Sequence, residues 1–193
     1  MEKVDKRAVF LDRDGVLNHL IDRGDSCFVS GRKVRFTAPW KYEEFRLFDR
    51  VSKSLQKLRE AGFICILATN QPDLAYGLLF SEDHERIMTD VRSLPLDDIF
   101  VCPHGRDEGC ECKKPKPGML LLATEKWNID FSSSFVIGDT NSDVKTGKLM
   151  NCRTILINSP ATEKDANDKP DFVVANLKEA VNLIVNRFVP KGL

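Results

Sequence analysis

Six short apolar runs constrain the fold of this chain more than any other feature. They occupy residues 8–12, 63–69, 98–102, 134–139, 153–158 and 171–174. Runs of Val, Ile, Leu and Phe without polar alternation are typical of strands buried on both faces, as the strands of parallel sheets are. The sequence therefore predicts a mainly parallel sheet.

Helical patterns fill most of the intervals between these runs. Residues 48–62 place apolar residues at helical spacing and end at Gly62, a residue favoured after helix C-termini. Strands and helices that alternate in this way predict an α/β fold, a doubly wound sheet within a single domain over residues 1–193. Further helices are expected at 81–93, 117–128 and 176–188.

The charge balance and the apolar runs exclude several classes of partner. Lys plus Arg and Asp plus Glu number 29 each, so the whole chain offers no basic footprint for nucleic acid or an anionic membrane surface. No apolar run approaches the roughly 20 residues that span a bilayer, and the N-terminal residues lack the pattern of a secretory signal. We expect a cytoplasmic monomer without nucleic-acid or membrane partners.

Two carboxylates, Asp12 and Asp14, follow the first apolar run directly. In a doubly wound sheet, functional residues gather at the carboxyl ends of the strands. Carboxylates this close repel each other unless a cation joins them, which predicts Mg²⁺, an ion that prefers oxygen ligands. One carboxylate could attack phosphorus while the other acts as general acid and base. A capped, solvated turn is the alternative.

Two other strand ends carry polar groups of a similar kind. Thr69 and Asn70 follow the second run, where a hydroxyl and an amide could donate hydrogen bonds to phosphate oxygens. Asp139 and Asp143 follow the fourth run. Turn formation or helix capping would explain each group alone. Their joint occurrence at three predicted strand ends favours a functional site.

Together these residues resemble the four ordered motifs of the haloacid dehalogenase (HAD) superfamily of aspartyl phosphotransferases. The matching segments are "DRDG" at 12–15, Thr69-Asn70, a lysine before proline, and "GDTNSD" at 138–143. The resemblance implies a phosphatase that works through an aspartyl-phosphate, with Asp12 as nucleophile and Asp14 as acid and base. It also implies a Rossmann-like HAD fold with a small flap and no large cap domain.

The same resemblance implies how the ligands are held. Mg²⁺ would be bound by the carboxylates of Asp12 and Asp139 and by the backbone carbonyl of Asp14, with Asp143 supporting them. The substrate would contact the residues after the second strand, Thr69, Asn70 and Gln71.

Three cysteines and a histidine cluster within residues 102–112. Cys102, His104, Cys110 and Cys112 form the pattern C-x-H-x5-C-x-C. Four such ligands in one short loop match a closed, tetrahedral structural zinc site. The alternatives are a disulfide, which a reducing compartment disfavours, and free surface thiols.

The sequence around these cysteines is similar to one branch of the superfamily. That branch contains D-glycero-D-manno-heptose-1,7-bisphosphate 7-phosphatases and the phosphatase region of bifunctional histidinol-phosphate phosphatases. In the branch an Arg-Lys pair follows the last cysteine, whereas here the pair is Lys113-Lys114. Lys114 is thereby identified with the lysine that binds the substrate's phosphate. Lys113 would also contact substrate, but it cannot reproduce the bidentate fork of an arginine.

Residues 19–47 fit no strand–helix unit. A small hairpin is predicted within them at 27–36, with its turn at Ser30-Gly31. As a flap beside the end of the first strand, the segment would set specificity, and its cations would suit a bisphosphate. A solvated hairpin without a partner is equally consistent with the charges. The basic residues of the segment include Arg23, Arg32, Lys33 and Arg35.

The chain combines sequence features of the two kinds of enzyme in this branch. "FLDRDGVLN" and "KPKPGMLL" resemble the heptose enzymes, whereas the short interval between His104 and Cys110 resembles histidinol-phosphate phosphatases. Tyr76 stands where the heptose enzymes carry an arginine. The resemblance favours a Mg²⁺-dependent phosphatase for a small phosphorylated sugar, most similar to the heptose type, with histidinol phosphate as the alternative.

A zinc-containing nucleic-acid-binding module is the alternative of another class. The zero net charge opposes it, and so do Pro115 and Pro117, which interrupt any reading helix after the cysteines.

Overall fold

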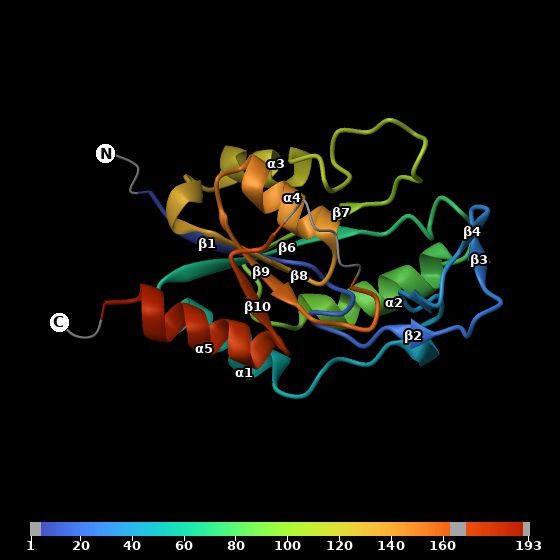
Figure 1. The fold of residues 1–193 in the computed structure, drawn as a ribbon, viewed down its shortest axis with the longest axis horizontal. Helices are drawn as coiled ribbons and strands as arrows, with labels where there is room; N and C mark the ends of the chain where they lie inside the picture. Colours follow the sequence, from blue (N-terminus) through green and yellow to red (C-terminus); the bar gives the residue numbers. More distant parts are fainter. Residues whose placement is uncertain (1–4, 163–168, 191–193) are drawn as a thin grey trace.

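A six-stranded parallel sheet forms the centre of the computed structural model, which describes residues 5–162 and 169–190. The strand order is β10-β9-β8-β1-β6-β7, and every neighbouring pair is parallel (Figure 1). This arrangement confirms the predicted α/β fold with a mainly parallel sheet. The strands are β1 (Arg7–Leu11), β6 (Phe63–Asn70), β7 (Asp98–Cys102), β8 (Phe135–Gly138), β9 (Arg153–Ile157) and β10 (Phe172–Val174).

Helices cover both faces of the sheet, which explains why its central strands are apolar along most of their length. Within β1, Val9 and Leu11 enter one hydrophobic core, while Ala8 and Phe10 enter a second core on the opposite face. The first core packs against α1 (Val51–Glu60), α2 (Ser81–Arg92) and α5 (Leu177–Phe188), and the second against α3 (Gly118–Lys126). These four helices confirm the four predicted ones to within a few residues at each end.

A fifth helix, α4 (Asn141–Leu149), was not expected from the sequence. It begins two residues after Asp139, inside the segment interpreted as a strand end with a polar loop. Its signal is a capping box, in which the Asp143 carboxylate accepts hydrogen bonds from the backbone N–H and the hydroxyl of Thr140. The helix packs against β8 and β9 on the α3 face (Figure 1).

The segment between β1 and α1 builds two small hairpins and one turn of 3₁₀ helix. The strands β3 (Phe28–Val29) and β4 (Arg32–Lys33) pair through a turn in which Ser30 and Gly31 have φ values of 48° and 74°. Two consecutive left-handed residues match the hairpin turn expected there. The other elements are β2 (Ile21–Asp22), β5 (Phe36–Thr37) and η1 (Tyr42–Glu44), and a second 3₁₀ turn, η2, covers Phe131–Ser133.

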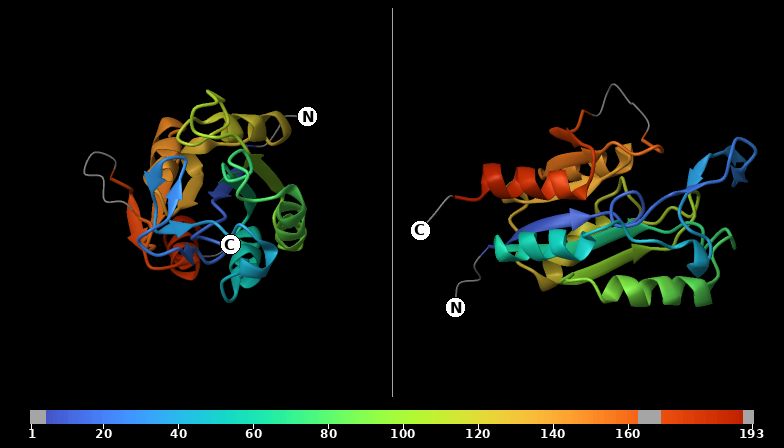
Figure 2. Two further views of the ribbon diagram at one scale, coloured as in Figure 1. Left: turned by 90° about the vertical axis from the view of Figure 1, so that its right-hand side faces the viewer. Right: turned by 90° about the horizontal axis from the view of Figure 1, so that it is seen from below.

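The strand order creates one switch point in the sheet. The chain starts at β1, continues outward through β6 and β7, and then crosses to β8 on the other side of β1. In open α/β sheets, ligands bind beyond the carboxyl ends of the strands at such a point. Figures 1 and 2 place the β3–β4 hairpin beyond this same edge of the sheet.

Among residues 5–162 and 169–190, no helix combines the length and apolar character of a membrane span.

Removing a core side chain on the face that carries α1 should destabilise the fold strongly. Leu55 is fully buried in the first core. We expect Leu55→Ala to lower the free energy of unfolding by about 2–5 kcal/mol, because it removes buried apolar surface and leaves a cavity. The matched Leu149→Ala change, at a side chain that is 66% exposed, should cost less than about 1 kcal/mol in the same urea titration. Equal losses for the two variants would contradict this packing.

Candidate functional site

Three carboxylates converge where β1 and β8 end. Asp12 follows β1, Asp139 follows β8, and Asp143 lies in the first turn of α4. Ligand oxygens of these three residues all lie within 4.8 Å of one another. The switch point of the sheet therefore holds a concentrated negative charge.

Two glycines make this approach possible. Gly15 has a φ of 75°, and a Cβ built on it would lie 2.1 Å from Oδ2 of Asp139. A Cβ on Gly138 would lie 2.1 Å from Cγ of Asp143. Any side chain at either position would displace an aspartate from the cluster, which is the physical reason for a glycine after Asp14 and before Asp139.

Lys114 is buried among these carboxylates, with an exposed fraction of 4%. Its Nζ lies 3.0 Å from Oδ2 of Asp12 and 2.6 Å from Oδ1 of Asp143. Asn70 fixes the backbone that carries this lysine: Lys114 N donates to Asn70 Oδ1, and Asn70 Nδ2 donates to Lys114 O. The side chain of Asn70, at the end of β6, therefore positions Lys114 directly.

Burial and mutual repulsion oppose the ionisation of this cluster. Burial raises the pKa of Asp12 to about 6, although the Lys114 ammonium pulls it down. Burial, followed by the charges of Asp12 and Asp143, raises the pKa of Asp139 to about 8. Burial alone would lower the pKa of Lys114, but Asp12 and Asp143 hold it above its usual value. Three carboxylates and a single ammonium leave an excess of negative charge that one further cation would neutralise.

The donor set suits Mg²⁺, because every available ligand atom is a hard oxygen. Asp143 has the least to offer, since its Oδ1 accepts from Lys114 and its Oδ2 from Thr140. Asp139 is held in place by the Ser159 hydroxyl, which donates to its Oδ2 at 2.8 Å. The oxygens of Asp12 and Asp139 are thus the side-chain ligands that best fit a divalent cation.

The side chain of Asp14 forms hydrogen bonds outside the group of Asp12, Lys114, Asp139 and Asp143. Its Oδ1 accepts from Asn18 Nδ2 and from the guanidinium of Arg13, and its Oδ2 accepts from Gln71 Nε2 at 2.7 Å. Gln71 also donates to the Thr69 hydroxyl at 3.1 Å and accepts from Arg13 Nη2. Thr69 and Gln71 are fully buried, so their side chains lie behind Asp14.

Arg13, the residue between the two aspartates, was not predicted as a site residue from the sequence. It is fully buried and forms an ion pair with Asp14 at 3.1 Å. No sequence signal marks it, because arginine is almost never fully buried without a partner and the partner is recognised only in the fold. Ser159 was missed for the same reason, since it reaches Asp139 from the loop after β9.

The Cys/His cluster lies beside this site, in the loop that follows β7. Cys102 Sγ lies 3.6 Å from His104 Nδ1 and 3.7 Å from Cys110 Sγ, and Cys112 Sγ lies 3.3 Å from His104 Nδ1. A disulfide would need about 2.05 Å between sulfurs, and all six cysteines are free. Ligands around a tetrahedral zinc ion are separated by roughly 3.5–3.8 Å. The four residues therefore fit a zinc ion.

Lys113 and Lys114 follow this cluster directly but have different environments. Lys114 enters the buried carboxylate site. Lys113 is half-buried, and its Nζ donates to the backbone carbonyl of His104 at 2.9 Å. The structure therefore brings Asp12, Lys114 and Asp139 together and places Lys113 at the edge, against the Cys/His loop.

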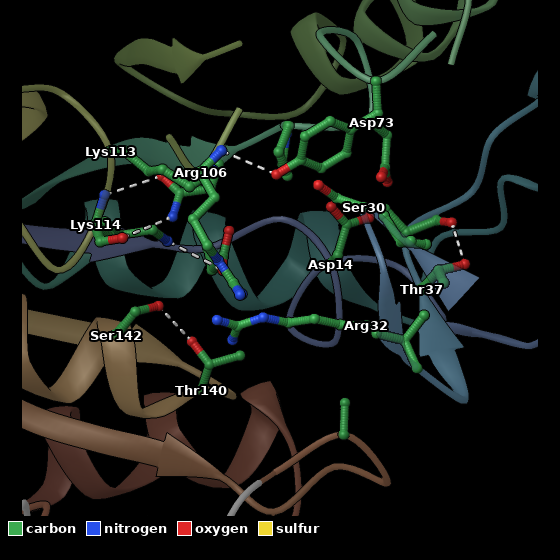
Figure 3. A pocket seen from close by; sticks show the side chains of 18 of the residues that line it. Asp14, Ser30, Arg32, Thr37, Asp73, Arg106, Lys113, Lys114, Thr140 and Ser142 are labelled. Carbon is green, nitrogen blue, oxygen red and sulfur yellow. Dashed lines mark hydrogen bonds and ion pairs between the residues drawn. The ribbon is translucent and has the colours of Figure 1, made fainter. Parts of the chain in front are cut away.

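A pocket of about 700 Å³ opens above the carboxylates (Figure 3). Asp12, Asp14, Lys114 and Asp139 line one part of it. The β3–β4 hairpin and the segment after it form a second wall, and the Cys/His loop forms a third. Residues from these walls include Val29, Ser30, Arg32, Val34, Phe36, Arg106, Gly109 and Cys110.

The chain is similar to several known proteins. A family model described as "HAD-hyrolase-like" matches residues 111–180. The D-glycero-beta-D-manno-heptose-1,7-bisphosphate 7-phosphatase of Pasteurella multocida (strain Pm70) is 35% identical over 93% of this chain and 97% of its own. A D-glycero-alpha-D-manno-heptose-1,7-bisphosphate 7-phosphatase of Campylobacter jejuni is 32% identical over 91% of this chain and 94% of its own.

A solved structure shares the fold. It is D,D-heptose 1,7-bisphosphate phosphatase from B. bronchiseptica complexed with magnesium and phosphate. The TM-score is 0.74 at 24% identity, over 93% of this chain and 98% of that one. At this identity the match shows the fold, a Rossmann-like HAD fold without a large cap domain.

The raised pKa of Asp139 predicts a pH-dependent stability of the metal-free protein. Between the unfolded pKa of 3.8 and the folded pKa of about 8, the folded state keeps a proton that the unfolded state has released. Above pH 6 the retained proton is mainly that of Asp139, because the pKa of Asp12 is about 6. Stability should therefore fall as pH rises from 6 to 8, by at most about 1.4 kcal/mol per pH unit. Asp139→Asn should remove most of this slope in urea titrations, because asparagine carries no such proton.

Two controls accompany that measurement. Asp49→Asn, at an exposed aspartate, should keep the slope of the unmodified protein. Millimolar Mg²⁺ should flatten the slope of the unmodified protein, since a bound cation replaces the proton. Identical slopes for the unmodified protein and Asp139→Asn would contradict the assignment of the buried charge.

Proposed function

Because the chain belongs to the family of D-glycero-D-manno-heptose-1,7-bisphosphate 7-phosphatases, within the HAD-like hydrolases, we propose that it hydrolyses the 7-phosphate ester of this sugar bisphosphate. One observation about the site supports the proposal. The buried group of Asp12, Lys114 and Asp139 opens on a single pocket, and that pocket is large enough for a phosphorylated sugar.

Asp12 is the proposed nucleophile. A carboxylate oxygen forms a bond to phosphorus while the bond from phosphorus to the sugar oxygen breaks, which leaves an aspartyl-phosphate. Lys114, 3.0 Å from Asp12, would stabilise the negative oxygens of the phosphoryl group as it transfers. Its ion pair with Asp143 keeps the ammonium in place before the substrate arrives.

Asp14 is the proposed acid and base. It gives a proton to the departing sugar oxygen, and it then takes a proton from the water that attacks the aspartyl-phosphate and releases inorganic phosphate. Asp14 lines the pocket, so its carboxyl group can face the leaving oxygen. Arg13 and Gln71 would orient that carboxyl group from behind. In this proposal Gln71 and Thr69 support Asp14 from behind, whereas Asn70 lines the phosphate end of the pocket.

Mg²⁺ is the proposed catalytic cation, held by the carboxylates of Asp12 and Asp139 and by the backbone carbonyl of Asp14. When bound, it would neutralise charge on the transferring phosphoryl group. The engagement of the Asp14 side chain by three neighbouring residues supports a contribution from its backbone rather than from its carboxylate.

Zinc is the proposed ion of the Cys/His cluster, with a structural role. A closed set of three sulfurs and one nitrogen leaves no position for substrate. The ion would join Cys102, at the end of β7, to Cys112, two residues before Lys114. It would thereby fix the loop that delivers Lys114 to Asp12.

Asp12→Asn tests the reaction. The variant should lose at least about a thousandfold in phosphate release, because an amide cannot form the covalent intermediate. Release is measured for both anomers of heptose 1,7-bisphosphate, for histidinol phosphate and for p-nitrophenyl phosphate. The heptose bisphosphate should give the highest kcat/KM, and Asp49→Asn should keep full activity. Preferred turnover of histidinol phosphate would overturn the substrate, and activity that survives in Asp12→Asn would overturn the mechanism.

Metal analysis of the purified protein tests the zinc site. We expect about one zinc ion per chain, and Cys110→Ser and Cys112→Ser should each lose it. Both variants should also lose thermal stability and phosphate release, since the loop would no longer hold Lys114. Cys27→Ser is the matched control, because Cys27 is a free, half-buried cysteine outside the cluster. A zinc-free protein, or equal losses in Cys27→Ser, would refute the site.

A further inference from the structure

We propose that Arg32 and Arg106 form an arginine clamp that binds the phosphate of the substrate that is not hydrolysed. Both residues line the pocket above Asp12, and in Figure 3 both side chains extend into it, Arg32 from the hairpin and Arg106 from the Cys/His loop. The clamp rests on the proposed function, because only a bisphosphate offers a second phosphate to bind.

Three arginines of the 19–47 segment, Arg23, Arg32 and Arg35, fall into two groups in the structure. Arg23 forms a bidentate pair with Glu44 and lies over the Trp40 ring, and Arg35 pairs with Asp22 at 3.0 Å. These two arginines hold the segment together. Arg32 has no carboxylate partner within the part of the chain that the structure describes, and it is the basic side chain of this segment that lines the pocket.

Arg106 is presented to the pocket in a defined way. It lies in the loop between His104 and Cys110, and its backbone N–H donates to the Tyr76 hydroxyl at 2.9 Å. Its guanidinium has no ion pair or hydrogen bond among residues 5–162 and 169–190. A fixed backbone and an uncommitted guanidinium are suited to binding a ligand that arrives from solution.

Two neighbouring side chains support the loop that carries Arg106. The Tyr76 hydroxyl accepts a hydrogen bond from the backbone N–H of Arg106. The Lys113 ammonium donates to the His104 carbonyl of the same loop. Both contacts hold the backbone of this loop beside the pocket, while the Arg106 side chain extends into the pocket (Figure 3).

The positive charges of Arg32 and Arg106 indicate that the ligand at this end of the pocket is an anion. Two unpaired guanidinium groups that face one pocket repel each other, and an anion between them removes that repulsion. Arginine suits phosphate in particular, because its planar fork donates two parallel hydrogen bonds to phosphate oxygens. The reacting phosphate would lie against Asp12 and Lys114 on the floor of the pocket. The clamp would hold the phosphate at the other end of the sugar.

Steady-state kinetics with two substrates tests the clamp. The substrates are heptose 1,7-bisphosphate and the same heptose with only its 7-phosphate. Arg32→Gln and Arg106→Gln should each lower the ratio of the two kcat/KM values about tenfold, and the double variant should lower it further, because each removes a charge-assisted bond to the second phosphate. Lys33→Gln is the matched control, since Lys33 is exposed on the same strand and does not line the pocket; its ratio should equal that of the unmodified protein.

The outcomes separate the clamp from the proposed function. Efficient turnover of the bisphosphate with an unchanged ratio in both arginine variants would overturn the clamp and leave the function standing. An unmodified protein that hydrolyses neither heptose phosphate would overturn the function. In that case inhibition of p-nitrophenyl phosphate turnover decides the clamp. Fructose 1,6-bisphosphate should then inhibit at least tenfold more strongly than fructose 6-phosphate, and the double variant should lose this difference; equal inhibition in the unmodified protein would overturn the clamp.

Discussion

The ion pair between Lys114 and Asp12 is the interaction on which the rest of the site depends. Burial raises the pKa of Asp12 to about 6, and without the ammonium 3.0 Å away it would rise further. At neutral pH the carboxylate is therefore mostly ionised, as the proposed role of nucleophile requires. Asp139 differs, because its pKa of about 8 favours the protonated form at neutral pH, and a bound cation would replace that proton. The oxygen ligands and the charge of the site suit a divalent ion.

Elements far apart in the sequence hold that lysine in place. Asn70 at the end of β6 bonds both the backbone N–H and the carbonyl of Lys114, and Asp143 in α4 accepts from its ammonium. The Cys/His cluster ends at Cys112, two residues before Lys114. The conformation of this loop therefore determines where the chain enters the site. A buried charge without partners costs much free energy, because it has lost its hydration. The contacts from Asn70 and Asp143 therefore stabilise the Lys114 ammonium among the three carboxylates. The same loop carries Arg106, so its conformation affects both the Lys114 end and the Arg106 end of the pocket.

The sequence was sufficient to predict what depends on local pattern. The strands, four of the five helices, the hairpin turn at Ser30-Gly31 and the polar groups at the strand ends all follow from periodicity and turn chemistry. It was not sufficient where partners meet only in three dimensions. Arg13 lies buried behind Asp14, Asn70 holds the Lys114 backbone, and α4 begins immediately at the strand end, where its cap was interpreted as part of a loop.

In the proposed reaction, phosphoryl transfer passes through Asp12. The most direct test is to quench the protein in acid during turnover of heptose 1,7-bisphosphate and to locate covalent phosphate by peptide mass spectrometry. We expect phosphate on the peptide that contains Asp12, at a level that rises with substrate and disappears when turnover is complete. Turnover without a phosphorylated peptide, or with phosphate on a different residue, would contradict a covalent intermediate on Asp12.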